Sequence, residues 1–427
     1  MGESLISDRL VPFRWLAAWT DPALLRLFSN GPINCFLFDR LASARGIVDA
    51  ARAKGMETME WAALGAAPFD QVKWNISAPQ VAITGLVWPQ LKPPARGDAD
   101  AGPTGAPWID SNTWVKRLAA ARAPRRAIWL GFERPKDDAT PAAAAYTTAI
   151  ADSAAAGARW MVILDDKRQE GVATGDPEAL RTWDAIIAAL RFFQTHRSWN
   201  AWPRSGPVGV MSDFAGNNEF MGQEFLNLAA RRKLLYRVLS RSDGNPSLEG
   251  LLAVLYLDRE PPTAALQSRL LAFARSGGLV IVPRAVAASF GGGRPISCPV
   301  AGYEWRPLGQ GAIAAATLDR DDPYFLAADV HNLIRRRSDP FTLFNAASLW
   351  EHYSVAPDGR AAVLQLVGFA SRPYGSVSVA MAHSWRSATL YVIGSVLPTH
   401  LQPALVEGRL ELHLPPFSNY AALEFHS

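Results

Sequence analysis

The sequence predicts an α/β protein in which a (β/α) barrel, short of its full set of units, precedes a small α/β unit and a C-terminal antiparallel β-sandwich. Three observations carry this prediction. Apolar strands alternate with helical stretches over the first two hundred residues, a break at 202–206 opens a second α/β pattern, and the hydrophobic period becomes two from about residue 345. We therefore expect domains at 1–203, 206–320 and 321–427, the last with a short helical lead-in.

The first domain carries the clearest pattern. Strict alternation predicts a parallel sheet covered by helices, and six or so units favour a barrel over an open doubly wound sheet. No GxGxxG or GxxxxGK[ST] motif follows these strands, so the signature of a nucleotide-binding open sheet is missing. The expected strands are 15–19, 33–38, 57–64, 81–88, 127–132 and 160–164, and the expected helices are 23–28, 45–54, 114–123, 146–156 and 177–196.

The second domain is expected to be a scaffold without chemistry of its own, and the third is expected to be a small sandwich. In the second, strands at 207–213, 251–257 and 279–283 surround helices at 219–239 and 263–275, with no nucleophile between strand and helix. In the third, period-two strands at 361–367, 375–381, 388–393, 409–414 and 421–425 predict an antiparallel sandwich. His413 and His426 alternate with apolar residues, and we expect both to face solvent.

Composition excludes several classes of function. The chain has 427 residues, 49% hydrophobic and 19% charged, with a net charge of +4. Its basic runs, 231–233 and 335–337, fall on predicted helices and favour solvated faces over a nucleic-acid surface. Cys35 and Cys298 lack CxxC or Cys/His neighbours, so we expect no zinc site, no disulfide framework, and no other metal or cofactor.

Membrane and export signals are also missing from the sequence. No apolar stretch reaches the roughly 18 to 20 residues of a membrane span. The first residues lack the basic and apolar segments of a signal peptide. We expect a cytoplasmic protein from the sequence as given, or an exported one if a signal peptide has been removed.

Carboxylates and tryptophans gather where the predicted strands end, which is where a barrel places its chemistry. Twelve of the fifteen tryptophans precede Pro203. Paired carboxylates with aromatic platforms are what glycoside hydrolysis requires. The alternative is structural, because a strand-end carboxylate often caps the next helix or pairs with an arginine. The strand-end residues are Trp19, Asp39, Glu60, Trp61, Trp88, Glu133, Asp165 and Asp166.

Three carboxylates are candidates for catalysis. Glu133 ends a strongly apolar strand, where burial would favour the neutral form of a general acid. Arg134 follows it directly, and a close guanidinium would instead keep Glu133 ionised. Asp165, at the end of the next strand, is the expected ionised partner, and Asp110 is its substitute.

Five residues are candidates for holding the substrate. The long segment 92–112 ends in Trp108, Asp110 and Asn112, a composition that suits a polyhydroxylated ligand. We expect Trp61, Trp88 and Trp108 to be partly exposed around one concavity, where their rings would stack on sugars, and Asn112 and Glu60 to bind hydroxyls. The alternative is that Asp110 or Ser111 only caps the helix that follows.

The order of the three domains, with the segment Leu-Leu-Ala-Phe-Ala-Arg-Ser-Gly-Gly-Leu-Val-Ile-Val at 270–282, resembles the multidomain β-galactosidase-like glycoside hydrolases. The resemblance implies a TIM-type barrel, an amidotransferase-like middle domain without its nucleophile, and homo-oligomer contacts through that domain. It also implies an Asn-Glu pair after the fourth strand and a second Glu after the seventh. The first such pair here, Asn218-Glu219, lies in the middle unit, so the family's catalytic residues are not carried over.

The first hypothesis is therefore a glycoside hydrolase that cleaves an oligo- or polysaccharide with two carboxylates, without nucleic-acid or membrane partners. The alternative is a catalytically inactive carbohydrate-binding or structural relative. A third hypothesis, a metal-dependent lyase or isomerase using Asp165 and Asp166, is weaker, because no histidine accompanies them and neighbouring side chains on a strand point apart. Whether two carboxylates face each other across a cleft separates the first two.

Overall fold

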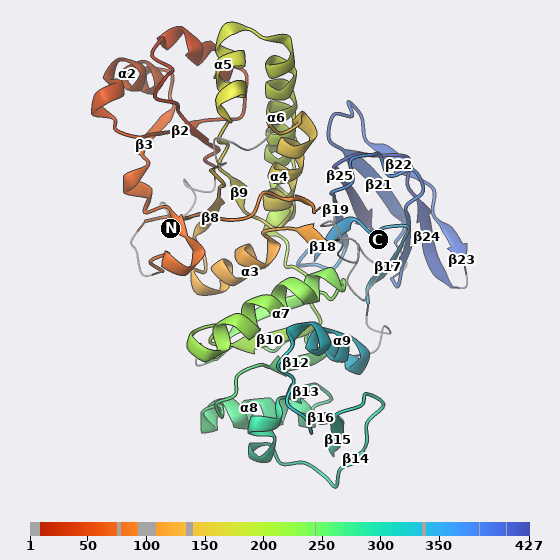
Figure 1. The fold of residues 1–427 in the computed structure, drawn as a ribbon. Helices are drawn as coiled ribbons and strands as arrows, with labels where there is room; N and C mark the ends of the chain where they lie inside the picture. The colour runs from red at the N-terminus through yellow and green to blue at the C-terminus, as the bar shows by residue number, and fades with distance from the viewer. Residues whose placement is uncertain are drawn as a thin grey trace, which may run out of the picture.

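The structure is a computed structural model that describes residues 9–74, 78–92, 108–133, 140–243, 245–334, 339–383, 385–406 and 408–427. Three parts follow one another along the chain, and the C-terminal part lies beside the N-terminal one (Figure 1). The expected α/β class is confirmed. Most of the long segment 92–112, Arg134 and the basic run 335–337 lie outside the described residues.

The N-terminal part contains short parallel strands in two sheets, ordered β1-β2-β3 and β4-β5-β8-β9. A parallel bridge between Phe13 and Val162 joins the sheets side by side. The strands are β1 (Pro12–Arg14), β2 (Cys35–Phe38), β3 (Glu57–Glu60), β4 (Ala67–Pro68), β5 (Gln80–Thr84), β8 (Ala127–Leu130) and β9 (Arg159–Trp160), with a small antiparallel pair, β6 (Gln90–Leu91) and β7 (Ile109–Asp110).

Helices separate these strands as the alternating pattern predicts. The helix α5 was not expected, and the segment 23–28 forms a 3₁₀ helix. The α-helices are α2 (Arg45–Ala53), α3 (Thr113–Arg122), α4 (Ala143–Ala155), α5 (Asp166–Thr174) and α6 (Pro177–Thr195). The 3₁₀ helices are η1 (Pro22–Phe28), η2 (Ala42–Ala44), η3 (Ala62–Leu64), η4 (Phe69–Gln71) and η5 (Arg197–Ala201).

The strands β2, β5 and β8 are buried on both faces, which explains their continuous apolar runs. Alternate residues on β2, β5 and β8 point to opposite sides. One set packs in a single small cluster, although β2 and β5 are not neighbouring strands. That cluster contains Leu10, Cys35, Leu37, Leu64, Ala82, Trp129 and Met161, whereas Phe36, Phe38, Val81, Ile83, Ile128 and Leu130 belong to the larger core.

Several strands are shorter than predicted, among them 57–64, which ends at Glu60, and two boundaries differ in position. The strand expected at 15–19 is β1 at Pro12–Arg14, and the expected segment is a buried loop in which the Trp15 indole donates to the Trp19 carbonyl at 3.0 Å. The strand expected at 81–88 ends at Thr84. Gly85 then has φ +66°, a conformation that favours glycine, so the chain turns before Trp88.

The middle part is one seven-stranded sheet in the order β11-β10-β12-β13-β16-β15-β14, with parallel pairing from β11 to β16. Its strands are β10 (Val208–Ser212), β11 (Tyr236–Ser240), β12 (Ala253–Tyr256), β13 (Leu279–Val282), β14 (Ile296–Ser297), β15 (Tyr303–Leu308) and β16 (Gly311–Ala316). Its helices are α7 (Glu219–Arg231), α8 (Ala264–Arg275) and α9 (Pro323–Ile334), with 3₁₀ helices η6 (Gly216–Asn218) and η7 (Arg284–Ser289).

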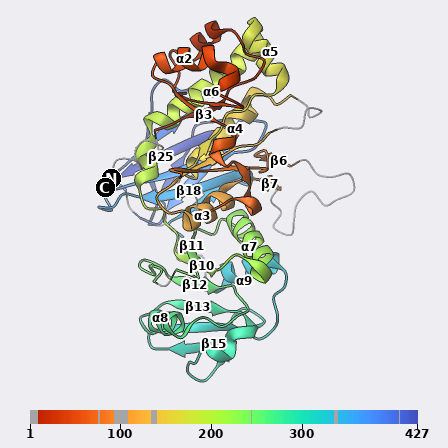
Figure 2. The same cartoon turned by 90° about the vertical axis from the view of Figure 1, so that its left-hand side faces the viewer.

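The helix expected at 219–239 is wrong in its second half. Helix α7 ends at Arg231, and Lys233 has φ +58°, which reverses the chain into β11. Near the junction with the N-terminal part, α7 lies against α3 (Figure 2), and Arg122 of α3 donates to the Phe214 carbonyl at 2.7 Å.

The C-terminal part consists of two antiparallel sheets, β17-β20-β24-β23 and β18-β19-β25-β21-β22. His413 and His426 are exposed, as expected. The strands are β17 (Phe341–Phe344), β18 (Leu349–Val355), β19 (Ala361–Gly368), β20 (Ser378–Met381), β21 (Ser387–Val392), β22 (Thr399–Leu401), β23 (Ala404–Val406), β24 (Arg409–His413) and β25 (Tyr420–His426).

The five-stranded sheet is covered on both faces. Leu364 and Leu423 face the other sheet, whereas Val363 and Tyr420 pack into the core shared with the N-terminal part. The Tyr420 ring lies 4.8 Å from that of Phe193 on α6, measured between centroids. The C-terminal part is therefore packed against helices that the sequence pattern assigned to a separate domain.

Helix α4 carries a fully buried carboxylate. Asp152 accepts from the Ser111 hydroxyl at 2.5 Å and from the Asn112 amide at 2.9 Å, so it holds the chain at the start of α3. Burial raises the pKa of Asp152 from 3.8 to about 6, and the hydrogen bonds from Ser111, Asn112 and Thr113 oppose that shift.

We predict that Asp152 makes the protein less stable as the pH rises. The folded protein holds this proton more tightly than the unfolded chain, so the contribution is greatest below pH 3.8 and is lost by about pH 6. The loss amounts to about 3 kcal/mol. Urea unfolding at pH 4 and pH 7 should show the stability of Asp152→Asn, relative to wild type, rising by this amount. The exposed Asp166→Asn is the control, and equal pH dependence in both variants would contradict the prediction.

Candidate functional site

Arg14 is the centre of a group of side chains at the carboxyl ends of the parallel strands. It is the last residue of β1, and 13% of its side chain is exposed. Its guanidinium forms an ion pair with Asp39, which follows β2, and lies 4.0 Å from the ring centroid of Trp61, which follows β3. Glu133, after β8, is close enough to act on its charge. The residues that follow β2 and β3 thus contact the cation at the end of β1, and Glu133 acts on its charge.

The charge on Arg14 is balanced by these carboxylates. Burial lowers the pKa of Arg14, while Asp39 and Glu133 act in the opposite direction. Its Nη1 atom is buried and has no hydrogen-bond partner within the part of the chain that the structure describes.

Glu60 ties this group together. Its Oε1 atom accepts from the backbone amide of Leu41 at 2.9 Å, which joins the end of β3 to the segment after β2. The side chain is half-buried. One of its oxygens thus has a structural role, in addition to the hydroxyl-binding role expected from the sequence.

A cavity of about 290 Å³ adjoins Asp39, between the segments that follow β1 and β2. The indole N–H groups of Trp15 and Trp19 are used internally, since Trp19 donates to the Gln169 carbonyl at 3.3 Å. The cavity therefore offers ring surface together with exposed polar side chains, a combination that suits a small polar ligand. Its polar lining residues are Thr20, Asp39, Arg40, Ser43 and Arg45.

Glu133 does not have the environment expected from the sequence. Its side chain is exposed, so the expectation that burial would keep it neutral is wrong. The strand ends at Leu130, three residues before Glu133, and the chain has left the sheet by that point. What the structure gives Glu133 is proximity to Arg14.

Asp165 caps a helix. Its Oδ1 atom accepts from the Arg168 amide at 3.1 Å at the start of α5, and its Oδ2 atom accepts from the Tyr146 hydroxyl at 2.9 Å. Asp166 is exposed in the first turn. Among the described residues, no group of three or more His, Cys, Asp or Glu side chains is placed to hold a metal ion. The structural role weighed for Asp165 is thus observed.

Asp110 and Trp108 contact the middle part of the protein. The Trp108 indole donates to Asp110 Oδ1 at 3.1 Å, and the guanidinium carbon of Arg231, on α7, lies 3.7 Å from the ring centroid. Trp108 is 37% exposed. Burial lowers the pKa of Arg231, and Asp110 opposes that effect. These residues therefore help to join α7 to the N-terminal part.

Two expectations about substrate contacts are wrong. Trp88 is 5% exposed, because its ring packs 5.2 Å from Tyr146 and 5.8 Å from Trp160 between centroids. Asn112 is buried, and its side-chain amide donates to the Val87 carbonyl at 2.9 Å. Neither side chain has a free surface for a sugar, and Trp61, Trp88 and Trp108 do not surround one concavity.

Arg14 is the functional candidate that the sequence argument did not consider. The sequence did contain a sign of its importance, because Arg14 is an ionisable residue inside the apolar run 10–16. When such a run is buried, its charged side chain requires a partner. Asp39 was noted only as a strand-end residue. Its pairing with Arg14 across 25 positions is visible only in three dimensions.

We predict that Trp88 and Trp108 differ in their contribution to stability. Trp88→Ala opens a cavity in the core and should lower the free energy of unfolding by about 3–5 kcal/mol. Trp108→Ala removes one partly exposed ring and its arginine contact, and should cost about 1 kcal/mol. Urea unfolding followed by far-UV circular dichroism measures both. Similar losses in the two variants would contradict the burial difference.

Across the described residues, no helix is both long and apolar enough to cross a membrane. No protein-family model matches the sequence, and a comparison with curated proteins finds no match. Solved structures do match. α-L-Fucosidase isoenzyme 2 from Paenibacillus thiaminolyticus has a TM-score of 0.52 at 10% identity, covering 94% of this chain and 79% of that one.

A β-galactosidase from Bacillus circulans sp. alkalophilus has a TM-score of 0.53 at 9% identity, covering 98% of this chain and 99% of that one. At such identities the similarity concerns the fold. The expected resemblance to multidomain β-galactosidase-like glycoside hydrolases is therefore confirmed at the level of the fold.

Proposed function

We propose that this protein is a glycoside hydrolase and that its site is the group around Arg14. The observation that carries the proposal is the meeting of Arg14, Asp39, Glu133 and Trp61 at the carboxyl ends of parallel strands. In this fold class, that edge is where chemistry is placed. The cavity beside Asp39 supplies room for one sugar ring.

The fold-level part of the proposal is a (β/α) barrel at 1–203 with fewer than the usual eight strands. Its support is the parallel order from β3 through β1 and β9 to β4, together with the shared interior cluster. A flavodoxin- or amidotransferase-like unit at 206–320 and a β-sandwich at 321–427 complete it. Oligomer contacts through the middle unit stay a prediction.

The proposed chemistry uses two carboxyl groups. One donates a proton to the glycosidic oxygen as the bond to the leaving group breaks, and the other, ionised, either attacks the anomeric carbon or activates the water that does so. Glu133 and Asp39 are the proposed pair: Asp39, in the ion pair with Arg14, takes the ionised role, and Glu133 takes the proton-donating role. Arg14 would hold their positions relative to the sugar.

Asp165 and Asp110 are the alternatives to Asp39 as the second carboxylate. Asp165 has both oxygens in hydrogen bonds, and Asp110 has one bonded to Trp108. Using either in catalysis would break contacts that hold a helix or an interface. Asp39, with 57% of its side chain exposed, can reach a ligand while its ion pair with Arg14 stays in place.

A carbohydrate-binding protein without catalysis is the second candidate. It is favoured by the existing engagement of Asp39 with Arg14 and of Glu60 with Leu41, which makes the strand ends a fixed surface. Such a surface could bind a sugar through Trp61 and the cavity without supplying an acid and a base.

Hydrolysis of a panel of aryl glycosides tests the first proposal. The panel starts with β-galactosides and α-L-fucosides, the substrates named for the two similar structures. We predict that Glu133→Gln and Asp39→Asn each lose about a hundredfold or more in kcat/KM. Asp165→Asn, Asp110→Asn and the exposed control Asp166→Asn should stay within about threefold of wild type.

Each other outcome has a defined meaning. Full activity in both Glu133→Gln and Asp39→Asn, with unchanged thermal midpoints, would remove these residues from the mechanism. A large loss in Asp165→Asn or Asp110→Asn alone would move the second role to that residue. A wild-type protein that binds glycans in calorimetry but hydrolyses none of the panel would favour the binding protein.

A further inference from the structure

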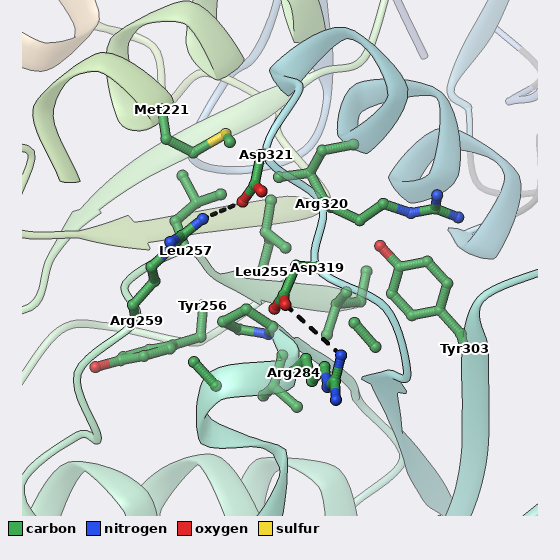
Figure 3. A pocket seen from close by; sticks show the side chains of 16 residues that line it. Met221, Leu255, Tyr256, Leu257, Arg259, Arg284, Tyr303, Asp319, Arg320 and Asp321 are labelled. Carbon is green, nitrogen blue, oxygen red and sulfur yellow. Dashed lines mark hydrogen bonds and ion pairs between the residues drawn. The ribbon is translucent and has the colours of Figure 1, made fainter. Parts of the chain in front are cut away.

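The middle part contains a second cavity, of about 150 Å³, at the carboxyl ends of β12, β13 and β16 (Figure 3). This edge of a parallel sheet is where open α/β folds bind their ligands. The sequence argument expected a scaffold without chemistry here. The small volume restricts a ligand to a few heavy atoms, since pockets for drug-sized molecules hold roughly 300–1,000 Å³.

The floor of this cavity is aliphatic. It is formed by side chains from three strands and from helix α9, all of them buried, and it accepts no hydrogen bonds. A ligand that fills it gains by removing apolar surface from water. The floor residues are Leu255, Leu257, Ile281, Val282, Ala316 and Leu326.

The rim of the cavity carries two arginines and two aspartates, so its charges cancel. Arg259 forms an ion pair with Asp321, and Arg284 forms one with Asp319 at 3.6 Å between Nη1 and Oδ2 (Figure 3). All four side chains are more than half exposed. Exposed ion pairs stabilise a protein little, so a ligand can open the looser pair, Arg284–Asp319, at small cost.

Another charged residue of the cavity, Arg320, is held more firmly. Its Nε atom lies 2.8 Å from Asp329 Oδ2, and its guanidinium faces the buried Tyr303 ring. It forms part of the wall. The charges that remain for a ligand are therefore two guanidiniums and two carboxylates.

The neighbouring crevice between β10 and β12, where the strand order reverses, is filled by protein side chains. Asp258 is fully buried there, accepts from the Ser212 hydroxyl at 2.5 Å, and lies 3.1 Å from Arg241 Nε. Arg241 also pairs with Asp213 at 3.1 Å. Because this network occupies the usual ligand position, the open space lies over the next strands.

We propose that the cavity binds a free α-amino acid with an aliphatic side chain, such as leucine. The aliphatic floor takes the side chain, Arg284 binds the carboxylate and Asp319 binds the ammonium group. A zwitterion leaves the rim neutral, and it replaces one exposed ion pair by two charge-assisted contacts. A nucleotide does not fit, because no glycine-rich phosphate loop precedes a helix here.

Calorimetric titration of the full chain with leucine tests the proposal. N-acetyl-leucine lacks the ammonium group and leucinamide lacks the carboxylate, so each should bind at least about tenfold more weakly than leucine. Arg284→Gln should weaken leucine binding about tenfold without changing leucinamide binding. Asp319→Asn should weaken leucine about tenfold without changing N-acetyl-leucine.

Arg275→Gln, an exposed arginine at the end of α8 outside the cavity, is the matched control and should bind leucine as wild type does. The proposal is overturned if leucine gives no binding heat at millimolar concentration. It is also overturned if the three ligands bind equally, if galactose binds here and leucine does not, or if the rim variants behave like Arg275→Gln. Thermal midpoints equal to wild type show that the variants are folded.

Discussion

The burial of helix α4 is the constraint on which the N-terminal and C-terminal parts both depend. Every residue from Tyr146 to Ala155 is buried, so this helix has no solvent face. It packs against α6 and β9 on its own side and against β19 of the C-terminal part. Its alanines allow close approach, and because water is excluded its polar groups favour protein partners, with the buried Ser153 Oγ as an exception among the described residues. Thr148 accordingly donates to the Gly368 carbonyl at 3.2 Å.

The candidate site also shows that a buried polar group needs partners. A guanidinium with little exposure requires counter-charges, and Asp39 and Glu133 supply them. Their proximity to Arg14 is therefore a structural necessity before it is a catalytic one. The two roles are compatible, because a two-carboxylate mechanism also needs its carboxyl groups held in place. The assay of the two carboxylates therefore distinguishes an enzyme from a binding protein.

Local sequence patterns predicted most helices and strands of the N-terminal part, because apolar period and helix caps are local properties. They did not predict β11, since the apolar residues after Lys233 continue a helical spacing and only its positive φ reverses the chain. They also treated the C-terminal sheet as covered on one face. Its second face packs on α4 and α6, a contact between segments more than two hundred residues apart.

The sequence indicated the kinds of residue in the candidate site, but not which individual residues belong to it. The carboxyl ends of the strands are where the proposed site lies, but a strand end shows neither which side chain faces a ligand nor which is used by its neighbours. Asp165 caps helix α5, and the Asn112 side chain donates to the Val87 carbonyl. The same distinction, between side chains used by their neighbours and side chains left open, applies to the middle part. There Asp258, the most buried carboxylate at that edge, is fully engaged, whereas exposed and loosely paired groups border the open cavity. In the middle part, the groups free to meet a ligand are those that the fold does not already require.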